Sequence, residues 1–201
     1  MSIKGRMYPR RDMHTAFDLT FSHCRLIVNL AVEQQKYYSP LRKPPTAKER
    51  SRQLTELKAE FDWLRKSPAP AVALQQALKD YEQGLTNFFE GRANKPTFKS
   101  YSKGENSFRV TGKGNIKIRK LSRTKYEVHI PKIGWCKVTL PRELPISKVT
   151  SYTVSMTRSG KYHISFNTIK PVNTKKTKSK NPKNDVAIDL GCAKTITLST
   201  G

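Results

Sequence analysis

Apolar residues recur every three or four positions through the first half of the chain, and this period predicts three amphipathic helices. The apolar stripes occupy residues 17–31, 54–64 and 74–88. Thr46-Ala47-Lys48-Glu49 has the pattern of a capping box at the start of the second helix, and Gly91 is placed to end the third. We expect the stripes, with their aromatic residues, to face inward and form a small helical lobe.

After Gly91 the period changes from 3.6 to 2, which predicts short strands. The alternating segments are 3–8, 116–119, 126–130, 136–140, 152–156 and 162–166. Arg158-Ser159-Gly160 predicts a hairpin turn between the last two. Short strands at this spacing predict a small antiparallel β-barrel. The predicted fold class is therefore α+β, with a three-helix lobe inserted in the barrel after its first strand.

The chain is strongly basic: its 201 residues include 39 Lys and Arg against 15 Asp and Glu, a net charge of +24. Charge of this size indicates a polyanionic partner, above all nucleic acid, and binding that weakens with salt. No apolar run approaches the roughly 20 residues that cross a bilayer, and residues 1–11 lack the apolar core of a signal peptide. We therefore expect no membrane partner and a cytoplasmic location.

The cysteines and histidines do not form a metal-binding pattern. Cys24, Cys136 and Cys192 are isolated, and the four histidines are dispersed. No two cysteines have the close spacing of a zinc ribbon, so zinc is not expected. Cys24 and Cys136 lie on apolar faces and are interpreted as core residues.

Residues 91–130 combine positive charge with aromatic rings. They contain eleven Lys and Arg and two acids, with Phe98, Tyr101 and Phe108 between the basic positions. Lys and Arg neutralise phosphates and rings stack on bases, so the segment predicts a nucleic-acid groove, although an ordinary solvated surface has the same composition. The basic candidates are Arg92, Lys95, Lys99, Arg109, Lys117 and Arg119.

A second chemical feature lies near the end of the sequence. Residues 171–184 hold five lysines and no acid, which predicts a linker, and the apolar run 186–191 then carries Asp189 on a predicted buried strand. Metal-dependent phosphodiester hydrolysis uses two ions about 3.5–4 Å apart. Asp185 lies four strand residues away, about 13 Å, which is too far to share such a pair. Asp189 therefore predicts one part of a nuclease site.

The order of these segments resembles the transposon-encoded TnpB proteins, also known as the OrfB transposase family, which are relatives of type V CRISPR nucleases. The match extends along the whole sequence, and its specificity lies in the shared order of short motifs. These motifs are Arg6-Met7-Tyr8-Pro9, Cys24 to Asn29, Leu54 to Lys58, Trp63-Leu64, Leu74 to Asp80, Asn87-Phe88-Phe89, Pro96 to Lys99, Ser107-Phe108-Arg109, Pro131 to Trp135 and Asp189-Leu190-Gly191.

The resemblance implies a protein that binds a guide RNA and cleaves matching target DNA with a magnesium-dependent RuvC-like site. It implies a first barrel strand at 1–10, a helical recognition lobe at 11–92, a wedge barrel at 93–170, a linker at 171–184 and the start of the RuvC-like domain at 185–201. Ser51, Gln75 and Thr111 would contact the short duplex motif beside the target. Ala47 and Ala71 stand where the family leads us to expect larger side chains.

The resemblance also implies a later Glu, a zinc ribbon and a final Asp, and residues 1–201 contain none of these motifs. Asp189 would be the only one of three magnesium-binding carboxylates, so we expect these residues to bind nucleic acid without cutting it alone. The alternatives are half of a split nuclease completed by a C-terminal fragment, or a regulator that occupies DNA by guide pairing. An actin-like ATPase loop and a plain ribosome-associated RNA-binding protein are further alternatives.

Overall fold

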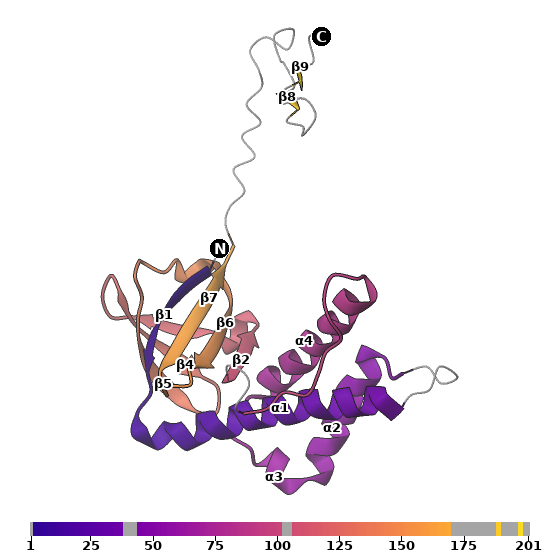
Figure 1. The fold of residues 1–201 in the computed structure, drawn as a ribbon. Helices are drawn as coiled ribbons and strands as arrows, with labels where there is room; N and C mark the ends of the chain where they lie inside the picture. The colour runs from indigo at the N-terminus through magenta and orange to yellow at the C-terminus, as the bar shows by residue number, and fades with distance from the viewer. Residues whose placement is uncertain (1, 38–43, 102–105, 170–187, 190–196, 199–201) are drawn as a thin grey trace. The chain divides into compact units, whose positions relative to one another are not determined.

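The computed structural model describes residues 2–37, 44–101, 106–169, 188–189 and 197–198. The chain divides into two units, residues 1–170 and 171–201. In the first unit an antiparallel sheet is joined to a group of helices, which confirms the predicted α+β class (Figure 1). The wedge and RuvC assignments remain predictions.

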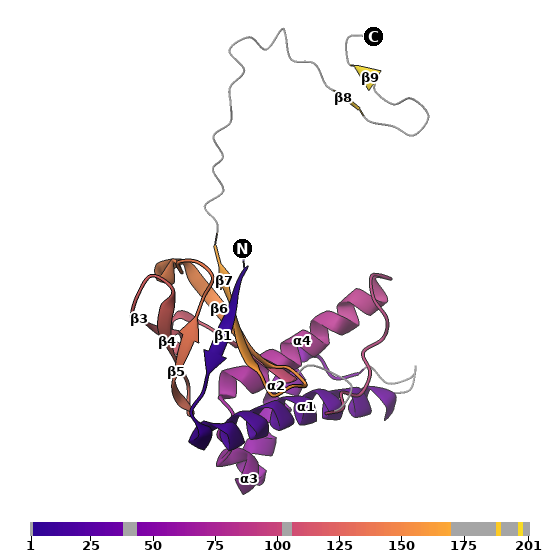
Figure 2. The ribbon, with the colours of Figure 1, turned by 60° about the vertical axis from the view of Figure 1, so that its left-hand side comes forward.

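The sheet has seven strands in the order β2-β6-β7-β1-β5-β4-β3, and every neighbouring pair is antiparallel. The strands are β1 (Ser2–Tyr8), β2 (Asn106–Thr111), β3 (Lys117–Lys120), β4 (Lys125–Ile130), β5 (Gly134–Thr139), β6 (Val149–Met156) and β7 (Tyr162–Thr168). The sheet curls so that β3–β5 lie across from β6 and β7 (Figure 2).

The predicted small antiparallel barrel takes the form of a curled half-barrel, with β2 and β3 at its edges. The edge at β2 is covered by helices, because α1 (His14–Tyr37) and α4 (Ala71–Phe89) both contact this strand. Covering an edge strand with a helix protects its unpaired backbone groups from other chains, which is one alternative to closing the barrel.

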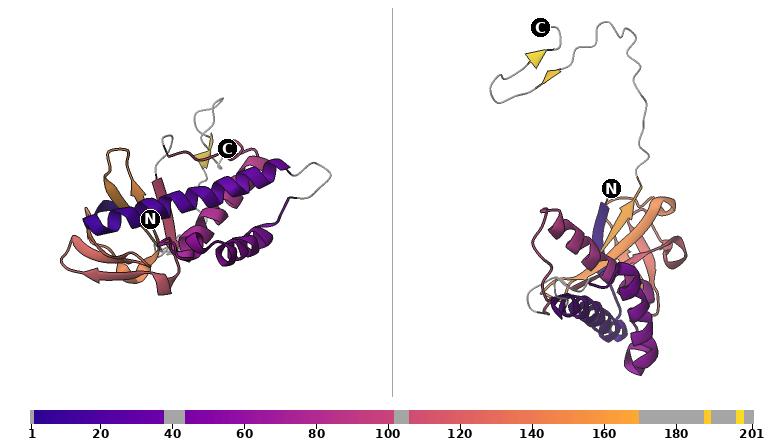
Figure 3. Two further views of the ribbon diagram at one scale, coloured as in Figure 1. Left: turned by 90° about the horizontal axis from the view of Figure 1, so that it is seen from below. Right: turned by 90° about the vertical axis from the view of Figure 1, so that its right-hand side faces the viewer.

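The helices form between β1 and β2 in the sequence, and α1 runs from beside the sheet into the helical lobe (Figures 1 and 3). The other members of the lobe are α2 (Ala47–Glu60) and α3 (Asp62–Arg65). Short 3-10 helices occur at η1 (Arg11–Met13), η2 (Lys113–Asn115) and η3 (Ile146–Lys148).

The predicted helix signals are confirmed at two ends. The Thr46 N–H donates to Glu49 Oε2 at 2.7 Å and the Glu49 N–H donates to Thr46 Oγ1 at 3.3 Å, so the capping box forms. Gly91 follows α4 with φ of 71°, a left-handed conformation that glycine adopts without strain. The Arg92 N–H then donates to the carbonyl of Asn87 at 2.8 Å.

The predicted second helix is wrong in one respect, because it divides at Phe61. This residue is extended and caps α2, whereas Leu64 lies in the separate α3. Leu54 and Leu64 are both buried, while Phe61 is exposed. Phe88, at the end of the third predicted stripe, is also exposed. Apolar periodicity therefore located the core-facing stripe correctly but overestimated its length.

An aromatic cluster joins α1 to the sheet. Phe17 lies with its ring centroid 6.2 Å from Phe108 on β2 and 5.3 Å from Tyr162 on β7, and Phe21 lies 5.5 Å from Phe108. All four rings are buried. Aromatic pairs at these separations contribute about 0.5–1.5 kcal/mol each beyond the burial of their apolar area. The cluster therefore fixes the helix against the sheet rather than merely covering it.

A buried arginine holds the lobe together. Arg50 on α2 is 4% exposed and pairs with Glu82 on α4 at 2.5 Å. Its other nitrogens donate to the side chains of Gln34 and Gln35 on α1, at 3.3 and 2.8 Å. The guanidinium also lies 5.4 Å from the ring of Tyr81, whose hydroxyl donates to the carbonyl of Ala31 at 3.1 Å. One side chain thus connects all three long helices.

The second unit contains β8 (Ile188–Asp189) paired antiparallel with β9 (Thr197–Leu198), with Asp189 opposite Thr197. This agrees with a strand at Asp189 that begins a hairpin. The predicted linker, Asp185 and Cys192 lie outside the described residues. Among the helices that the structure describes, none is long and apolar enough to cross a membrane.

We expect Arg50→Ala to lower the free energy of unfolding by about 3 kcal/mol, because it leaves Glu82 and two glutamines without their shared donor. Arg52→Ala is the matched control, since Arg52 pairs with Glu56 on the exposed side of the same helix. Its cost should stay below about 1 kcal/mol. Urea denaturation of both variants measures the difference, and equal costs would contradict the role given to Arg50.

Gly5 on β1 provides a test of the sheet. A Cβ at this position would lie 2.3 Å from the carbonyl oxygen of Thr139, so Gly5→Ala must push apart the paired strands β1 and β5. We expect a loss of about 1–3 kcal/mol in unfolding free energy. Gly114→Ala is the control, because nothing lies within 4 Å of its added carbon. Thermal denaturation of the two variants should give clearly different midpoints.

Candidate nucleic-acid interface

Residues 95–101 carry two exposed aromatic rings past the helical lobe. Asn29 on α1 fixes this segment: its Nδ2 donates to the Lys99 carbonyl at 2.9 Å, and the Lys99 N–H donates to Asn29 Oδ1 at 2.8 Å. Phe98 is 46% exposed and Tyr101 is 65% exposed. A segment held by its backbone can present these rings to a ligand without first becoming ordered.

Each exposed ring has a cation close to it. Lys36 Nζ lies 4.1 Å from the centroid of Phe98, and the Arg25 guanidinium carbon lies 5.2 Å from that of Tyr101. Rings that stack on bases beside cations that neutralise phosphates are the combination used by proteins that bind single-stranded nucleic acid. The structure thus brings Phe98 and Tyr101 together with two cations from α1, which the sequence pattern had not paired with them.

A cavity of about 500 Å³ lies beside this segment, between α1 and α4. Lys95 and Lys99, two of the predicted basic residues, line it together with Arg25. Among the described residues that line it, Asp80 is the only acidic one. The balance of charge in this cavity therefore favours an anionic ligand.

A second basic and aromatic surface lies on the outer face of β3, β4 and β5. The register places Lys117 opposite His129, and His129 opposite Trp135. The Arg119 guanidinium lies 4.0 Å from the Trp135 ring centroid, and the His129 ring lies 5.2 Å from it. Lys117 and Arg119 were predicted from the sequence, whereas His129 and Trp135 were missed as site residues. Their position on the polar side of the strand alternation was the available signal.

The pKa of His129 is lowered from its ordinary 6.5 by its partial burial first, and then by the positive charges of Lys117 and Arg119. This histidine is therefore neutral at neutral pH. The lowering by two cations shows that positive charge surrounds the imidazole. The register places Glu127 opposite both Arg119 and Lys137, so one carboxylate lies among the cations of this face, and the excess of cations favours an anionic ligand.

Two predicted basic residues are already paired with acids. Arg92 pairs with Glu90, and Arg109 on β2 pairs with Asp80 on α4. Phe108 is corrected outright: it is 4% exposed and packs against Phe17, so it does not stack on bases. Its position on the inward side of β2 explains the error, because an edge strand still presents one face to the core.

The three residues expected to contact a duplex motif lie on three different elements. Ser51 is exposed on α2, Gln75 is exposed on α4, and Thr111 is half-buried at the end of β2. Ala47 is the first residue of α2 and Ala71 is the first of α4, and both are exposed. The roles of these residues stay predictions.

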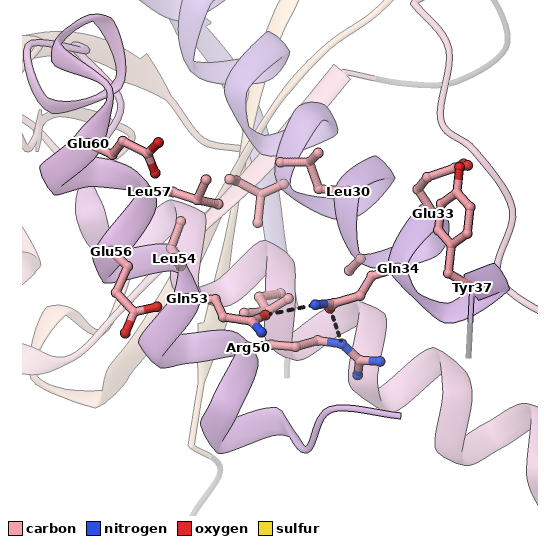
Figure 4. Close-up of a pocket in the computed structure, with 13 residues that line it drawn as sticks. Leu30, Glu33, Gln34, Tyr37, Arg50, Gln53, Leu54, Glu56, Leu57 and Glu60 are labelled. Atoms are coloured by element: carbon pink, nitrogen blue, oxygen red, sulfur yellow. Dashed lines mark hydrogen bonds between the residues drawn. The ribbon is translucent and has the colours of Figure 1, made fainter. Parts of the chain in front are cut away.

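A groove of about 460 Å³ between α1 and α2 has a different character (Figure 4). Leu30, Leu54 and Leu57 project into it, and Arg50 reaches across to Gln34. The other charged residues in its described lining are Glu33, Glu56 and Glu60. These carboxylates oppose a polyanion, so the groove is not part of the candidate interface.

In the part of the chain that the structure describes, no group of three or more His, Cys, Asp or Glu residues could hold a metal ion. Cys24 and Cys136 are buried, and burial raises the pKa of each thiol to about 12. They are therefore inert core residues, as predicted. Asp189 lies on β8 with its backbone paired to Thr197, and its predicted role in binding magnesium is untested.

Comparison with known proteins identifies the relatives. Putative RNA-guided DNA endonuclease InsQ of Escherichia coli strain K12 is 36% identical over 142 residues, which cover 71% of this chain and 32% of that protein. A putative RNA-guided DNA endonuclease of Streptomyces pristinaespiralis is 30% identical over 212 aligned positions, which cover 100% of this chain and 48% of that protein.

The chain belongs to the TnpB family. The predicted recognition is thus confirmed, although no family model matches the sequence. This TnpB-family chain spans less than half the length of the curated relatives that it matches. The activity in their names belongs to the whole proteins.

We expect His129 to titrate below 6.5 in the folded chain. Because the unfolded chain takes up this proton at a higher pH, the contribution of His129 lowers the unfolding free energy as the pH falls below 6.5. Lys117→Gln should raise the pKa of His129, because it removes the positive charge opposite the imidazole, whereas Lys4→Gln on β1 should leave this pKa unchanged. Proton NMR titration of the imidazole measures both pKa values, and a pKa of His129 at or above 6.5 in the unsubstituted chain would contradict the lowering by burial and by the two cations.

Proposed function

We propose that this chain is the nucleic-acid-binding portion of a transposon-encoded RNA-guided DNA endonuclease, and that it binds a guide RNA and the target DNA paired to it. The exposed aromatic rings with cations beside them, and the cavity lined by basic residues, support this proposal. The observation that carries it is the segment 95–101, where Phe98 and Tyr101 are exposed beside Lys36 and Arg25. The names of the two relatives supply the class of nucleic acid.

Under this proposal the helical lobe and half-barrel correspond to the recognition lobe and wedge domain, and β8 begins the RuvC-like domain. Ser51, Gln75 and Thr111 would read the duplex motif beside the target, while the rings and cations around residues 95–101 would hold the RNA. Asp189 would contribute one ligand to a pair of magnesium ions. Two-ion hydrolysis needs several carboxylates together, so residues 1–201 bind nucleic acid and do not cleave it alone.

The direct test is RNA binding by the purified chain as a function of salt. Binding should weaken steeply from low to high salt, because each neutralised phosphate releases condensed counterions. A flat salt dependence would contradict a polyanion surface. Sequencing the RNA that co-purifies with the chain then identifies the guide, and ribosomal RNA alone would favour a ribosome-associated protein instead.

Tyr101→Ala tests the stacking role within this function. We expect it to weaken RNA binding by about 1–3 kcal/mol, the contribution of one base stacked on an aromatic ring. Tyr37→Ala is the matched control, because Tyr37 is an exposed tyrosine on the acidic groove. Fluorescence anisotropy with labelled RNA measures both, and an equal loss from the two substitutions would place the RNA elsewhere.

Cleavage has its own test. The purified chain, given magnesium, guide and target plasmid, should leave the plasmid intact. Asp189→Ala should therefore change nothing in this assay and should leave RNA affinity unaltered. Nicking by the unsubstituted chain that Asp189→Ala abolishes would show instead that residues 1–201 assemble an active site.

A further inference from the structure

A small cavity of about 300 Å³ lies where α1, α4 and the edge strand β2 meet. Of the described residues that line it, three are cations, Arg25, Lys99 and Arg109, and one is a carboxylate, Asp80. Its volume equals roughly ten water molecules, which is enough for a phosphate group and part of its sugar. The cavity therefore combines net positive charge with a size suited to one phosphodiester.

Arg109 enters this cavity with unused hydrogen-bonding capacity. One terminal nitrogen pairs with Asp80 Oδ1, while Nε is buried and has no hydrogen-bond partner among the described residues. A guanidinium has five N–H donors arranged to bind two oxygens of one anion. The pair with Asp80 therefore leaves Arg109 incompletely satisfied.

Arg25 is positioned by neutral partners. Its two terminal nitrogens donate to Asn106 Oδ1 and to Ser22 Oγ, the latter at 2.9 Å, and its guanidinium lies against the Tyr101 ring. No carboxylate is among these contacts, so the charge of Arg25 is not neutralised by them. A fixed, uncompensated guanidinium is the feature that a phosphate-binding site requires.

The contacts of the Asp80 carboxylate are weak enough for it to move away from Arg109. Its side chain is 45% exposed, and besides Arg109 its Oδ1 accepts a hydrogen bond from Gln76 Nε2 at 3.2 Å. An exposed ion pair contributes about 0–1 kcal/mol, so moving the carboxylate into water costs little. Asp80 can therefore exchange Arg109 for solvent without disrupting α4.

We propose that this cavity binds one backbone phosphate of the nucleic acid, and that Asp80 occupies the phosphate's place on Arg109 while the chain is unbound. The proposal rests on the function proposed above. An entering phosphate displaces Asp80, takes two donors of Arg109 and approaches Arg25, and the released carboxylate turns to solvent. The seam between lobe and half-barrel thereby becomes part of the binding surface.

The experiment measures the RNA affinity of the full chain with two substitutions, one that removes a positive charge and one that removes a negative charge. Arg109→Gln should weaken binding by about tenfold, the effect of losing a charge-assisted pair of hydrogen bonds. Asp80→Asn should strengthen binding, because the competing carboxylate is gone. Arg65→Gln and Asp62→Asn are the matched controls, since these two residues form an exposed ion pair on α3. Each control changes the net charge equally and should shift affinity less than its counterpart.

The outcomes separate this inference from the proposed function. If the unsubstituted chain binds no RNA, the proposed function fails. If it binds RNA but Asp80→Asn weakens binding as Arg109→Gln does, the pair is merely structural and the phosphate site is refuted. Equal effects of the α3 controls would refute it too, since net charge alone would then account for the changes.

A second measurement keeps the test independent of how Arg109→Gln folds. Inorganic phosphate added to the unsubstituted chain should shift the Nε–H resonance of Arg109 in a nitrogen-edited NMR spectrum. In the Asp80→Asn variant, a lower concentration of phosphate should be enough to shift the same resonance. An Nε–H signal indifferent to phosphate in both proteins would overturn the assignment of the cavity.

Discussion

The packing of α1 and α4 against the edge strand β2 is the constraint on which the candidate interface depends. Phe17 and Phe21 bury their rings against Phe108, and this apolar contact sets the depth at which α1 lies on the sheet. The polar contacts between the two helices and β2 depend on this packing. Arg25 reaches Asn106, and Asp80 reaches Arg109, because the helices and the strand are held at side-chain distance.

The same packing explains why the half-barrel stays open. A barrel would pair β2 with β3, but the helices lie along β2 and occupy its free side. The covered edge keeps strand-pairing groups away from other chains. It also gives a basic protein a seam between two structural parts, where cations from both are concentrated. An edge covered by helices thus protects the sheet and, in the proposed function, contributes to binding.

The structure shows that the positive charge is unevenly distributed over the surface, which the amino-acid composition alone does not reveal. The exposed faces around residues 95–101 and on β3–β5 concentrate lysine, arginine and aromatic rings. The groove between α1 and α2 carries glutamates instead, even though the chain as a whole has a net charge of +24. Arg50 lies buried in that region, where its charge is satisfied by Glu82 and is not available to phosphate.

The sequence alone determined the α+β class, the helix caps at Thr46 and Gly91, the alternating strands and the family, because these depend on local periods and motif order. Only the tertiary structure decided that Phe108 is core, that Arg109 is paired, and that Lys36 and Arg25 lie close to exposed rings. It also revealed Arg50 as the centre of the lobe. These outcomes depend on partners distant in the chain, such as Asp80 for Arg109 and Glu82 for Arg50, and no local pattern specifies which distant residues meet.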